Sequence, residues 1–281
     1  MIYTLQKIGT DAEIFLKHRH TFSPVPVVGL LGGTKLCPKP IPNMINGFAI
    51  QEDNVMPEFN IPAASTAREF SDSINQVLEY LTIQMREHDL MLDIVPSMHF
   101  KESDLQSAQA QNFGCEPDLC AWTDEVNEID RANPKLRTMR TAAAHIHVSY
   151  LVDLEEPKTY AQRALAVRAH DLFVGVPSIL VDSDTDRREI YGKAGAFRCT
   201  DYGHEYRTPS NFWIRNNLWS EWVFNQTRNA LSFVSTADGR HVLENDVVLA
   251  NAIQDSINGH DEDTALMLCN EYDLTIPTKQ L

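Results

Sequence analysis

Charged and histidine side chains recur at i and i+2 within segments whose apolar neighbours favour β-strands. Alternate side chains of a strand project from the same face, so both members of each pair are expected to point the same way. Carboxylates, imidazoles and guanidinium groups gathered on one face could hold divalent cations and anionic substrates. The pairs are Asp11 with Glu13, His145 with His147, and Glu205 with Arg207.

Each pair also has an ordinary explanation when it is considered alone. Asp11 and Glu13 are equally compatible with one solvated strand face, and His145 and His147 with a hydrogen-bonded interior pair. Glu58, on a fourth extended segment, could be a surface salt-bridge partner. Four strands that each offer inward polar groups do not fit an apolar core, so we expect them to line a solvated or metal-filled cavity.

A basic, small-residue segment over residues 186–198 stands out in this acidic chain. Glycine and alanine let a backbone approach a ligand closely, and arginine forks match phosphate oxygens. The order of residues follows neither GxxxxGK[ST] nor GxGxxG, and a solvated basic turn is the ordinary alternative. The segment contains Arg187, Arg188, Tyr191, Lys193 and Arg198.

The elements expected to position these side chains alternate between extended and helical, without regular βαβ spacing, which favours an α+β fold. Thr66 and Glu69 have capping-box spacing before a helical apolar pattern. Pro57 suits an edge strand better than a central one. Expected strands cover 6–16, 54–61, 90–100, 142–150, 176–182 and 203–209. One helix is expected to start at residue 65 or 66, a second to run from about 157 to 174, and further helices to fill 214–281. Residues 24–47 are expected to form a loop, and residues 123–137 a polar excursion.

Bulk composition excludes several classes of protein. The 281 residues are compatible with one domain, 1–281, and the net charge of −15 argues against a surface that coats nucleic acid. Five cysteines without a CxxC pair predict reduced thiols in a cytoplasm rather than disulfides or a cysteine zinc site. No apolar run approaches the ~20 residues of a membrane span, and the start of the chain lacks the pattern of a signal peptide.

Taken together, the motifs resemble the phage-type COOH–NH2 ligases (amidoligases) of the glutamine synthetase and glutamate–cysteine ligase superfamily. The resemblance spans roughly residues 8–213, and the order of the motifs makes it specific. The segments that carry it are IGTDAEIF (8–15), GGTK (32–35), EDNVMPEFNIP (52–62), FGCEPD (113–118), HIHV (145–148), RREIYGKAGAFR (187–198) and EYRTPSNFW (205–213).

The resemblance implies a glutamine-synthetase-like curved antiparallel sheet with helices on its outer face, together with ATP and two or more Mg²⁺ ions. Implied metal ligands are Asp11, Glu13, Glu58, His145 and Glu205. Implied ATP-binding residues are Arg187, Arg188, Tyr191, Lys193, Arg198 and His147. Implied catalytic residues are Arg198, Arg207 and Glu205.

The expected reaction transfers the γ-phosphoryl group of ATP to a carboxylate, and an amine then attacks the acyl phosphate. The partners would be a small-molecule or peptide carboxylate and an amine, with a modified nucleobase as the sole nucleic-acid candidate; an oligomer is compatible with the sequence. Two rivals stay open: a zinc-dependent hydrolase using His145 and His147, and a non-catalytic nucleotide-binding phage protein.

Overall fold

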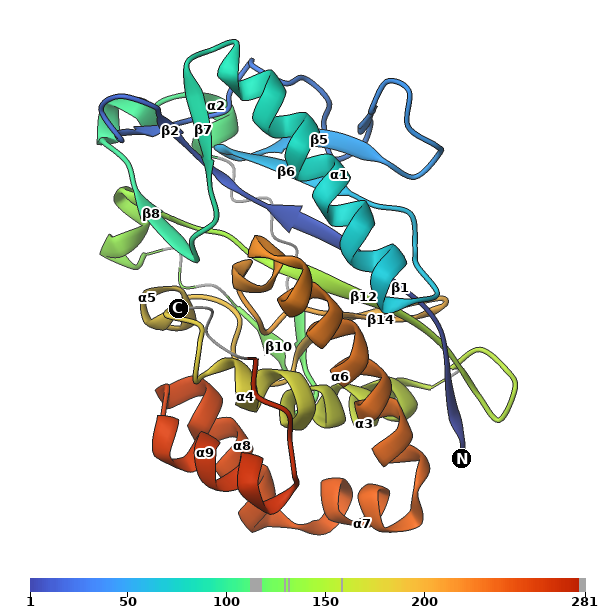
Figure 1. The fold of residues 1–281 in the computed structure, drawn as a ribbon. Helices are drawn as coiled ribbons and strands as arrows, with labels where there is room; N and C mark the ends of the chain where they lie inside the picture. The colour runs from blue at the N-terminus through green and yellow to red at the C-terminus, as the bar shows by residue number, and fades with distance from the viewer. Residues whose placement is uncertain (112–117, 129, 131, 158, 278–281) are drawn as a thin grey trace.

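A nine-stranded, wholly antiparallel sheet organises the chain in this computed structural model (Figure 1). The structure describes residues 1–111, 118–128, 130, 132–157 and 159–277. The sheet order is β10-β9-β13-β14-β12-β1-β6-β5-β4. Its strands are β1 (Tyr3–Glu13), β4 (Lys39–Pro40), β5 (Ala49–Asp53), β6 (Met56–Asn60), β9 (Asp118–Cys120), β10 (Val126–Asn127), β12 (Ala144–Val152), β13 (Ala196–Thr200) and β14 (Gly203–Tyr206).

Two smaller sheets flank the main one. One pairs β8 (Ser97–His99) with β11 (Met139–Thr141), and the other has the order β3-β2-β7. The strands of the latter are β2 (Phe15–His18), β3 (Pro24–Val25) and β7 (Leu90–Asp93). The α+β class predicted from the sequence is confirmed.

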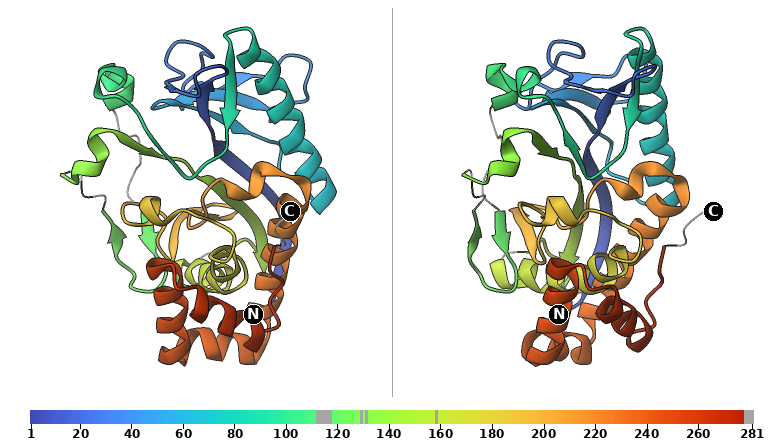
Figure 2. Two further views of the ribbon diagram at one scale, coloured as in Figure 1. Left: turned by 60° about the vertical axis from the view of Figure 1, so that its left-hand side comes forward. Right: turned by 90° about the vertical axis from the view of Figure 1, so that its left-hand side faces the viewer.

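Helices cover one face of the main sheet. In the right-hand view of Figure 2, α1 (Ala67–Arg86) and α6 (Asn217–Ser235) lie on the same side of β1. The remaining helices are α2 (Ala108–Gln111), α3 (Tyr160–His170), α4 (Val176–Ser178), α5 (Thr185–Arg188), α7 (Ala237–Asn245), α8 (Val247–Gly259) and α9 (Glu262–Glu271). Short 3₁₀ turns are η1 (Glu102–Leu105), η2 (Pro134–Arg137) and η4 (Phe212–Arg215), and η3 (Asp171–Gly175) is a π-helical continuation of α3.

Helix α1 begins as its sequence predicts. The Thr66 side chain accepts a hydrogen bond from the Glu69 backbone N–H at 3.2 Å, which satisfies one of the free donors of the first turn. The Glu69 carboxylate in turn accepts from the Ser65 N–H at 2.8 Å. Apolar residues at helical spacing, among them Phe70 and Ile74, are buried against the sheet.

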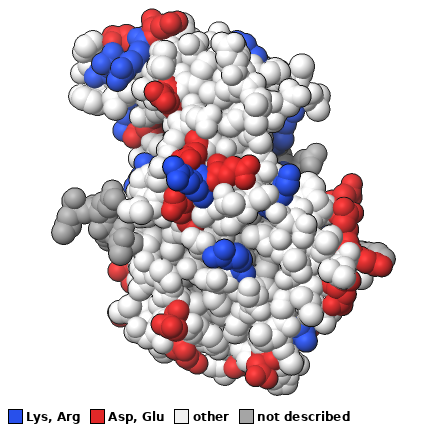
Figure 3. Space-filling model, turned by 45° about the vertical axis from the view of Figure 1, so that its right-hand side comes forward, with Lys and Arg blue, Asp and Glu red and all other residues white. Residues whose placement is uncertain are grey.

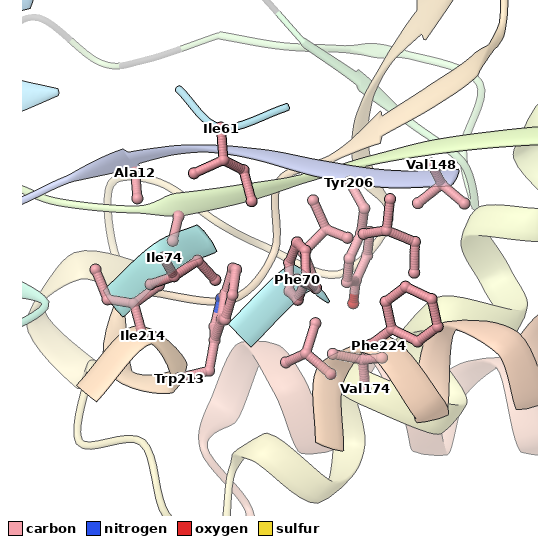
Figure 4. Close-up of a cluster of buried hydrophobic side chains, with 14 of the residues drawn as sticks. Ala12, Ile61, Phe70, Ile74, Val148, Val174, Tyr206, Trp213, Ile214 and Phe224 are labelled. Carbon is pink, nitrogen blue, oxygen red and sulfur yellow. The ribbon is translucent and has the colours of Figure 1, made fainter. Parts of the chain in front are cut away.

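The main core lies between the sheet and these helices (Figure 4). Strand β1 contributes Ile8 and Ala12, and β12 contributes Val148. Because β1 pairs with β12 in antiparallel register, these apolar side chains share the helix face, and the residues between them project from the opposite face. Phe70 stacks on Trp213 with ring centroids 5.6 Å apart. One face of the sheet is therefore closed by apolar packing, and the other carries the polar residues.

Two expectations about individual elements are wrong. Residues 176–182, expected to be extended, form the short helix α4 followed by turns; Pro177 occupies the first turn, where its missing N–H costs no hydrogen bond. Pro57 lies in β6, which is an interior strand between β1 and β5. Pro57 lies just beyond the last β1–β6 pair, Glu13–Glu58, and takes part there as an acceptor: its carbonyl accepts from the Ile14 N–H at 3.0 Å, a bond that does not need the N–H that proline lacks.

The final third of the chain is helical, as predicted, and the polar excursion at 123–137 contains β10 and η2 within its described residues. On the face drawn in Figure 3, charged side chains are scattered among uncharged ones, and the described residues on that face form no continuous basic surface. Among the helices of the described ranges, none combines the length and the apolar character needed to cross a membrane.

Candidate active site

Strand register brings the predicted polar residues together on the sheet face opposite the main helices. Directly paired residues in an antiparallel sheet project from the same face and lie close together. The structure forms three neighbouring rows in this way. The first is Arg198–Glu205–His147, the second is Asn60–Asp11–His145, and the third is Gln51–Glu58–Glu13.

Asp11, His147 and Glu205 form a group that could hold a metal ion. One ligand atom from each residue lies within 4.8 Å of the others. Two carboxylate oxygens and one imidazole nitrogen form a donor set that a divalent cation accepts. The residues present therefore fit a cation, although the group does not by itself select magnesium over zinc.

Asp11 lies between the two histidines. Its Oδ1 atom is 2.9 Å from His145 Nδ1 and 3.3 Å from His147 Nε2. Burial opposes ionisation of Asp11, but the two imidazoles outweigh it and hold the pKa of Asp11 well below its usual range. This shift favours the anionic form of Asp11, which is the form that binds a metal ion.

The two histidines differ in their protonation. Burial, with the Arg207 charge nearby, lowers the pKa of His145 to about 3. Burial also disfavours the charged form of His147, but the Asp11 carboxylate overcomes this and raises the pKa of His147 to about 10. In the absence of a cation, the positive charge next to Asp11 therefore resides on His147.

Glu13 and Glu58 form a second acidic position beside the first. They are directly opposite each other on β1 and β6. Burial, with the charge of Asp53, raises the pKa of Glu13 to about 8. Burial, with the charges of Asp11 and Glu13, raises the pKa of Glu58 well above its usual range. Carboxylates that repel each other in this way are stabilised as anions when a cation lies between them.

Hydrogen bonds fix the orientation of both glutamates. The Ala143 backbone N–H donates to Glu13 Oε2 at 2.8 Å, and the Gln51 side-chain amide donates to Glu58 Oε2 at 2.7 Å. Within the described residues, neither glutamate forms an ion pair with an Arg or Lys side chain. Their remaining oxygens are available to a ligand.

Arg207 belongs to the same face but is buried within the protein. Its guanidinium group donates hydrogen bonds to Glu205 and to the Tyr191 hydroxyl, and its Nε atom lies 3.2 Å from Asp118 Oδ2. Arg207 is 2% exposed. This geometry makes Arg207 a group that orients Glu205. Burial and the charge of Asp11 raise the pKa of Glu205 to about 7.

The other predicted cationic residues differ in their position. Arg198 Nη1 lies 3.8 Å from Glu205 Oε1, and its side chain is 19% exposed, so it can contact both the acidic cluster and a ligand. Lys193 is exposed and forms no ion pair with the described acids. Lys35, from the Gly-Gly-Thr-Lys segment, is exposed and lies close enough to lower the pKa of Glu205 by its charge.

Arg187 and Arg188 require a correction, because the structure does not bring them to the sheet face. Arg187 is 0% exposed and donates to Asp184 at 2.8 Å and to the Thr208 carbonyl at 2.9 Å. Arg188 donates to the same carboxylate at 2.5 Å and to the Ile257 carbonyl at 3.1 Å. Both arginines therefore stabilise the position of the segment 186–198 within the protein, and neither is accessible to a phosphate group in this structure.

Sequence reasoning did not assign roles to three residues that position the site. Asp118 ends the FGCEPD motif and holds Arg207; residues 113–117 of that motif lie outside the described residues. Tyr202 contacts His147 at 2.8 Å. Asp171, in the π-helix η3, accepts from the Tyr206 hydroxyl at 2.7 Å and anchors β14 from the helix side. Only Asp118 had a signal in the sequence, its place within a motif.

Comparison with known families identifies part of the chain. Residues 141–253 match the family described as Phage phiEco32-like COOH.NH2 ligase-type 2. This segment is similar to the COOH–NH2 ligases. The match confirms the predicted resemblance and extends it beyond residue 213, while a search of curated proteins gives no match.

The matched segment supplies only part of the site. His145, His147, Arg198, Glu205 and Arg207 lie within it, on β12, β13 and β14 and directly after β14. The facing acids come from β1 and β6, outside the matched residues; they are Asp11, Glu13 and Glu58. The sheet therefore completes the polar face of the matched segment with carboxylates from the N-terminal strands.

Proposed function

We propose that this chain is an ATP- and Mg²⁺-dependent carboxylate–amine ligase that forms an amide bond through an acyl phosphate. The observation that carries the proposal is the convergence of acids from β1, β6 and β14 on one sheet face of a chain whose residues 141–253 match a COOH–NH2 ligase family. The proposal includes a glutamine-synthetase-like architecture, with the polar sheet face as the substrate side and at least two cation positions.

The two cation positions correspond to two groups of residues. Asp11, His147 and Glu205 would hold one ion, and Glu13 with Glu58 would contribute to another. Bound Mg²⁺ supplies charge neutralisation for the phosphates of ATP. Carboxylate ligands of this kind are the ones that Mg²⁺ shares with substrate phosphates.

The chemistry requires activation because a carboxylate oxygen is a poor leaving group. A carboxylate oxygen of the acid substrate attacks the γ-phosphorus of ATP, the bond from that phosphorus to the bridging oxygen breaks, and ADP leaves. The amine nitrogen then attacks the acyl carbon, phosphate leaves, and the amine gives up a proton. Arg198, close to Glu205 and partly exposed, would stabilise negative charge on the transferred group, and Arg207 would keep Glu205 oriented.

The test is ADP release from pairs of acids and amines, followed by mass spectrometry of the adduct. Glu13→Gln and Arg198→Ala should each reduce amine-dependent ADP release by about 10²-fold or more. Arg68→Ala is the matched control, because the Arg68 side chain is 88% exposed on α1. Undiminished ADP release in both site variants would contradict the proposal.

The two rival functions give different outcomes in the same assays. Only His147 of the histidine pair belongs to the three-residue metal group. A zinc hydrolase would retain zinc through dialysis and show no stabilisation by ATP. A non-catalytic nucleotide-binding protein would be stabilised by ATP–Mg²⁺ without turnover of any acid and amine pair.

A further inference from the structure

Each of the two histidines beside Asp11 directs one ring nitrogen toward Asp11 and the other toward the hydroxyl of a different tyrosine. His147 directs Nε2 toward Asp11, and its Nδ1 lies 2.8 Å from the Tyr202 hydroxyl. His145 directs Nδ1 toward Asp11, and its Nε2 lies 3.4 Å from the Tyr191 hydroxyl. Asp11 is thus at the centre of a five-residue chain of polar contacts.

The two ends of this chain differ. Tyr191, which is half-buried, also accepts a hydrogen bond from the buried guanidinium group of Arg207, and that contact fixes the position of its hydroxyl. Tyr202 lies in the turn between β13 and β14 and is 39% exposed. Its backbone carbonyl accepts from the Tyr150 N–H at 3.2 Å, which holds the turn against β12. The Tyr202 hydroxyl therefore meets His147 from a defined position at the surface.

A neutral imidazole carries one N–H, and its other nitrogen is the one that can bind a cation. His147 contributes to the candidate metal group on the side of Asp11, where Nε2 lies 3.3 Å from Oδ1. For Nε2 to bind a cation, the proton must be on Nδ1. The Tyr202 oxygen is in place to accept that Nδ1–H.

We propose that Tyr202 is a positioning residue that fixes the ring orientation and the Nδ1–H tautomer of His147 for cation binding. The inference rests on the proposed cation site and deepens it. Partners on the far nitrogen of a metal-binding histidine orient the ring and raise its basicity, and their loss weakens metal affinity by about 10–100-fold.

The first measurement is Mn²⁺ binding to ATP-free protein by electron paramagnetic resonance, with Tyr202→Phe, His147→Ala and wild type compared. Tyr202→Phe should weaken Mn²⁺ affinity by about 10-fold or more, and His147→Ala by more than that. Tyr80→Phe is the control, because Tyr80 lies on α1, on the opposite side of the sheet. Tyr202 is half-exposed, so the phenylalanine variant should fold, and its melting temperature checks this.

The second measurement needs no variant. Long-range ¹H–¹⁵N correlation of wild-type protein with a diamagnetic cation, Mg²⁺, should show His147 with its proton on Nδ1. A cation-bound His147 with its proton on Nε2 would overturn the inference, as would wild-type Mn²⁺ affinity in Tyr202→Phe alongside weakened binding in His147→Ala. If His147→Ala also binds Mn²⁺ as wild type does, the proposed cation site itself is wrong at this residue, and the inference fails with it.

Discussion

Two charged clusters in this protein differ in how their charges are balanced. In the first, formed by Asp182, Asp184, Arg187, Arg188 and Ser210, each arginine lies beside an aspartate, and Ser210 donates to Asp182 at 2.9 Å. In the second, on the sheet face, Glu13 and Glu58 oppose each other and form no ion pair with the described residues.

The difference separates a structural cluster from a binding site. Burial and the charge of Asp184 raise the pKa of Asp182 to about 7, but Arg188 lies nearby to counter them. A buried carboxylate without such a partner is costly. The fold retains Glu13 and Glu58 facing each other, and a bound cation would remove that cost. Charge balance, rather than the mere presence of arginines or acids, is what distinguishes the two clusters.

The largest expected effect is loss of the balanced cluster. Arg187→Met should lower the free energy of unfolding by about 3–5 kcal/mol, because it leaves the Asp184 carboxylate buried with one charged partner fewer. Urea denaturation measures the loss. The exposed Arg68→Met control should stay within about 0.5 kcal/mol of wild type. Equal stability of the two variants would show that the cluster is not structural.

Neutralising the unbalanced cluster should have the opposite effect on stability. Glu58→Gln keeps the shape of the side chain but cannot ionise, so it avoids the burial and repulsion that raise the pKa of Glu58. We expect cation-free protein to be as stable as wild type or more stable, while Mg²⁺-dependent ADP release falls by about 10²-fold or more. A variant that is destabilised but still active would reverse the assignment of the two clusters.

The third prediction concerns pH. Glu13 has a pKa of about 8 in the folded chain, above the ordinary value of about 4.3 for glutamate. Between these two pKa values the cation-free native state binds more protons than the unfolded state, so the free energy of unfolding falls as the pH rises from about 4.3 to about 8. His147, whose pKa is raised to about 10, changes stability in the same direction over this interval, so the share due to Glu13 is isolated by comparison with Glu13→Gln.

Between pH 6.5 and 8, Glu13 alone should account for a loss of about 1–2 kcal/mol of unfolding free energy without a cation. Saturating Mg²⁺ should reduce or abolish the decline, since a bound cation favours the carboxylate. Glu13→Gln should flatten the cation-free curve compared with wild type. Chemical denaturation at several pH values, with EDTA or Mg²⁺, provides the measurement, and identical slopes in all four conditions would contradict the prediction.

The comparison also shows what the sequence could predict. The i, i+2 spacing of His145 and His147 places both on one strand face, and both contact Asp11 as a result. The sequence does not specify which residues face each other across strands, because register depends on pairing between segments far apart in the chain. The proximity of Asp11 to Glu205, contributed by β1 and β14, required the structure.

The basic segment shows why composition alone was ambiguous. Arginines near glycines fit both a phosphate loop and a set of buried ion pairs. The distinguishing signal was the acid at Asp184, which lies three and four residues before Arg187 and Arg188, the spacing of ion pairs on one helical turn. A strand predicted over residues 176–182 does not suggest a helical turn at 184–188, so the sequence alone gave no reason to pair Asp184 with these arginines.

The smallest expected effect concerns the exposed lysines near the two clusters. Lys35 lowers the pKa of Glu205 by its charge, whereas Lys193 has no ion pair with the described acids. The loop that carries Lys35 is held by Glu52, whose carboxylate accepts hydrogen bonds from the Gly29 and Leu31 N–H groups, each at 2.8 Å. The loop therefore presents Lys35 from a defined position without burying it.

Lys35→Met should raise the KM for ATP by a few fold, in keeping with the ~0.2–1 kcal/mol typical of exposed charge pairs, and leave the melting temperature unchanged. Lys193→Met is the matched control and should have a smaller effect on KM. Steady-state kinetics at low and high salt measure both, and the Lys35 effect should shrink as ions screen the charge. A larger KM change in Lys193→Met would place the approaching phosphate nearer to the segment 187–198 than to the Lys35 loop.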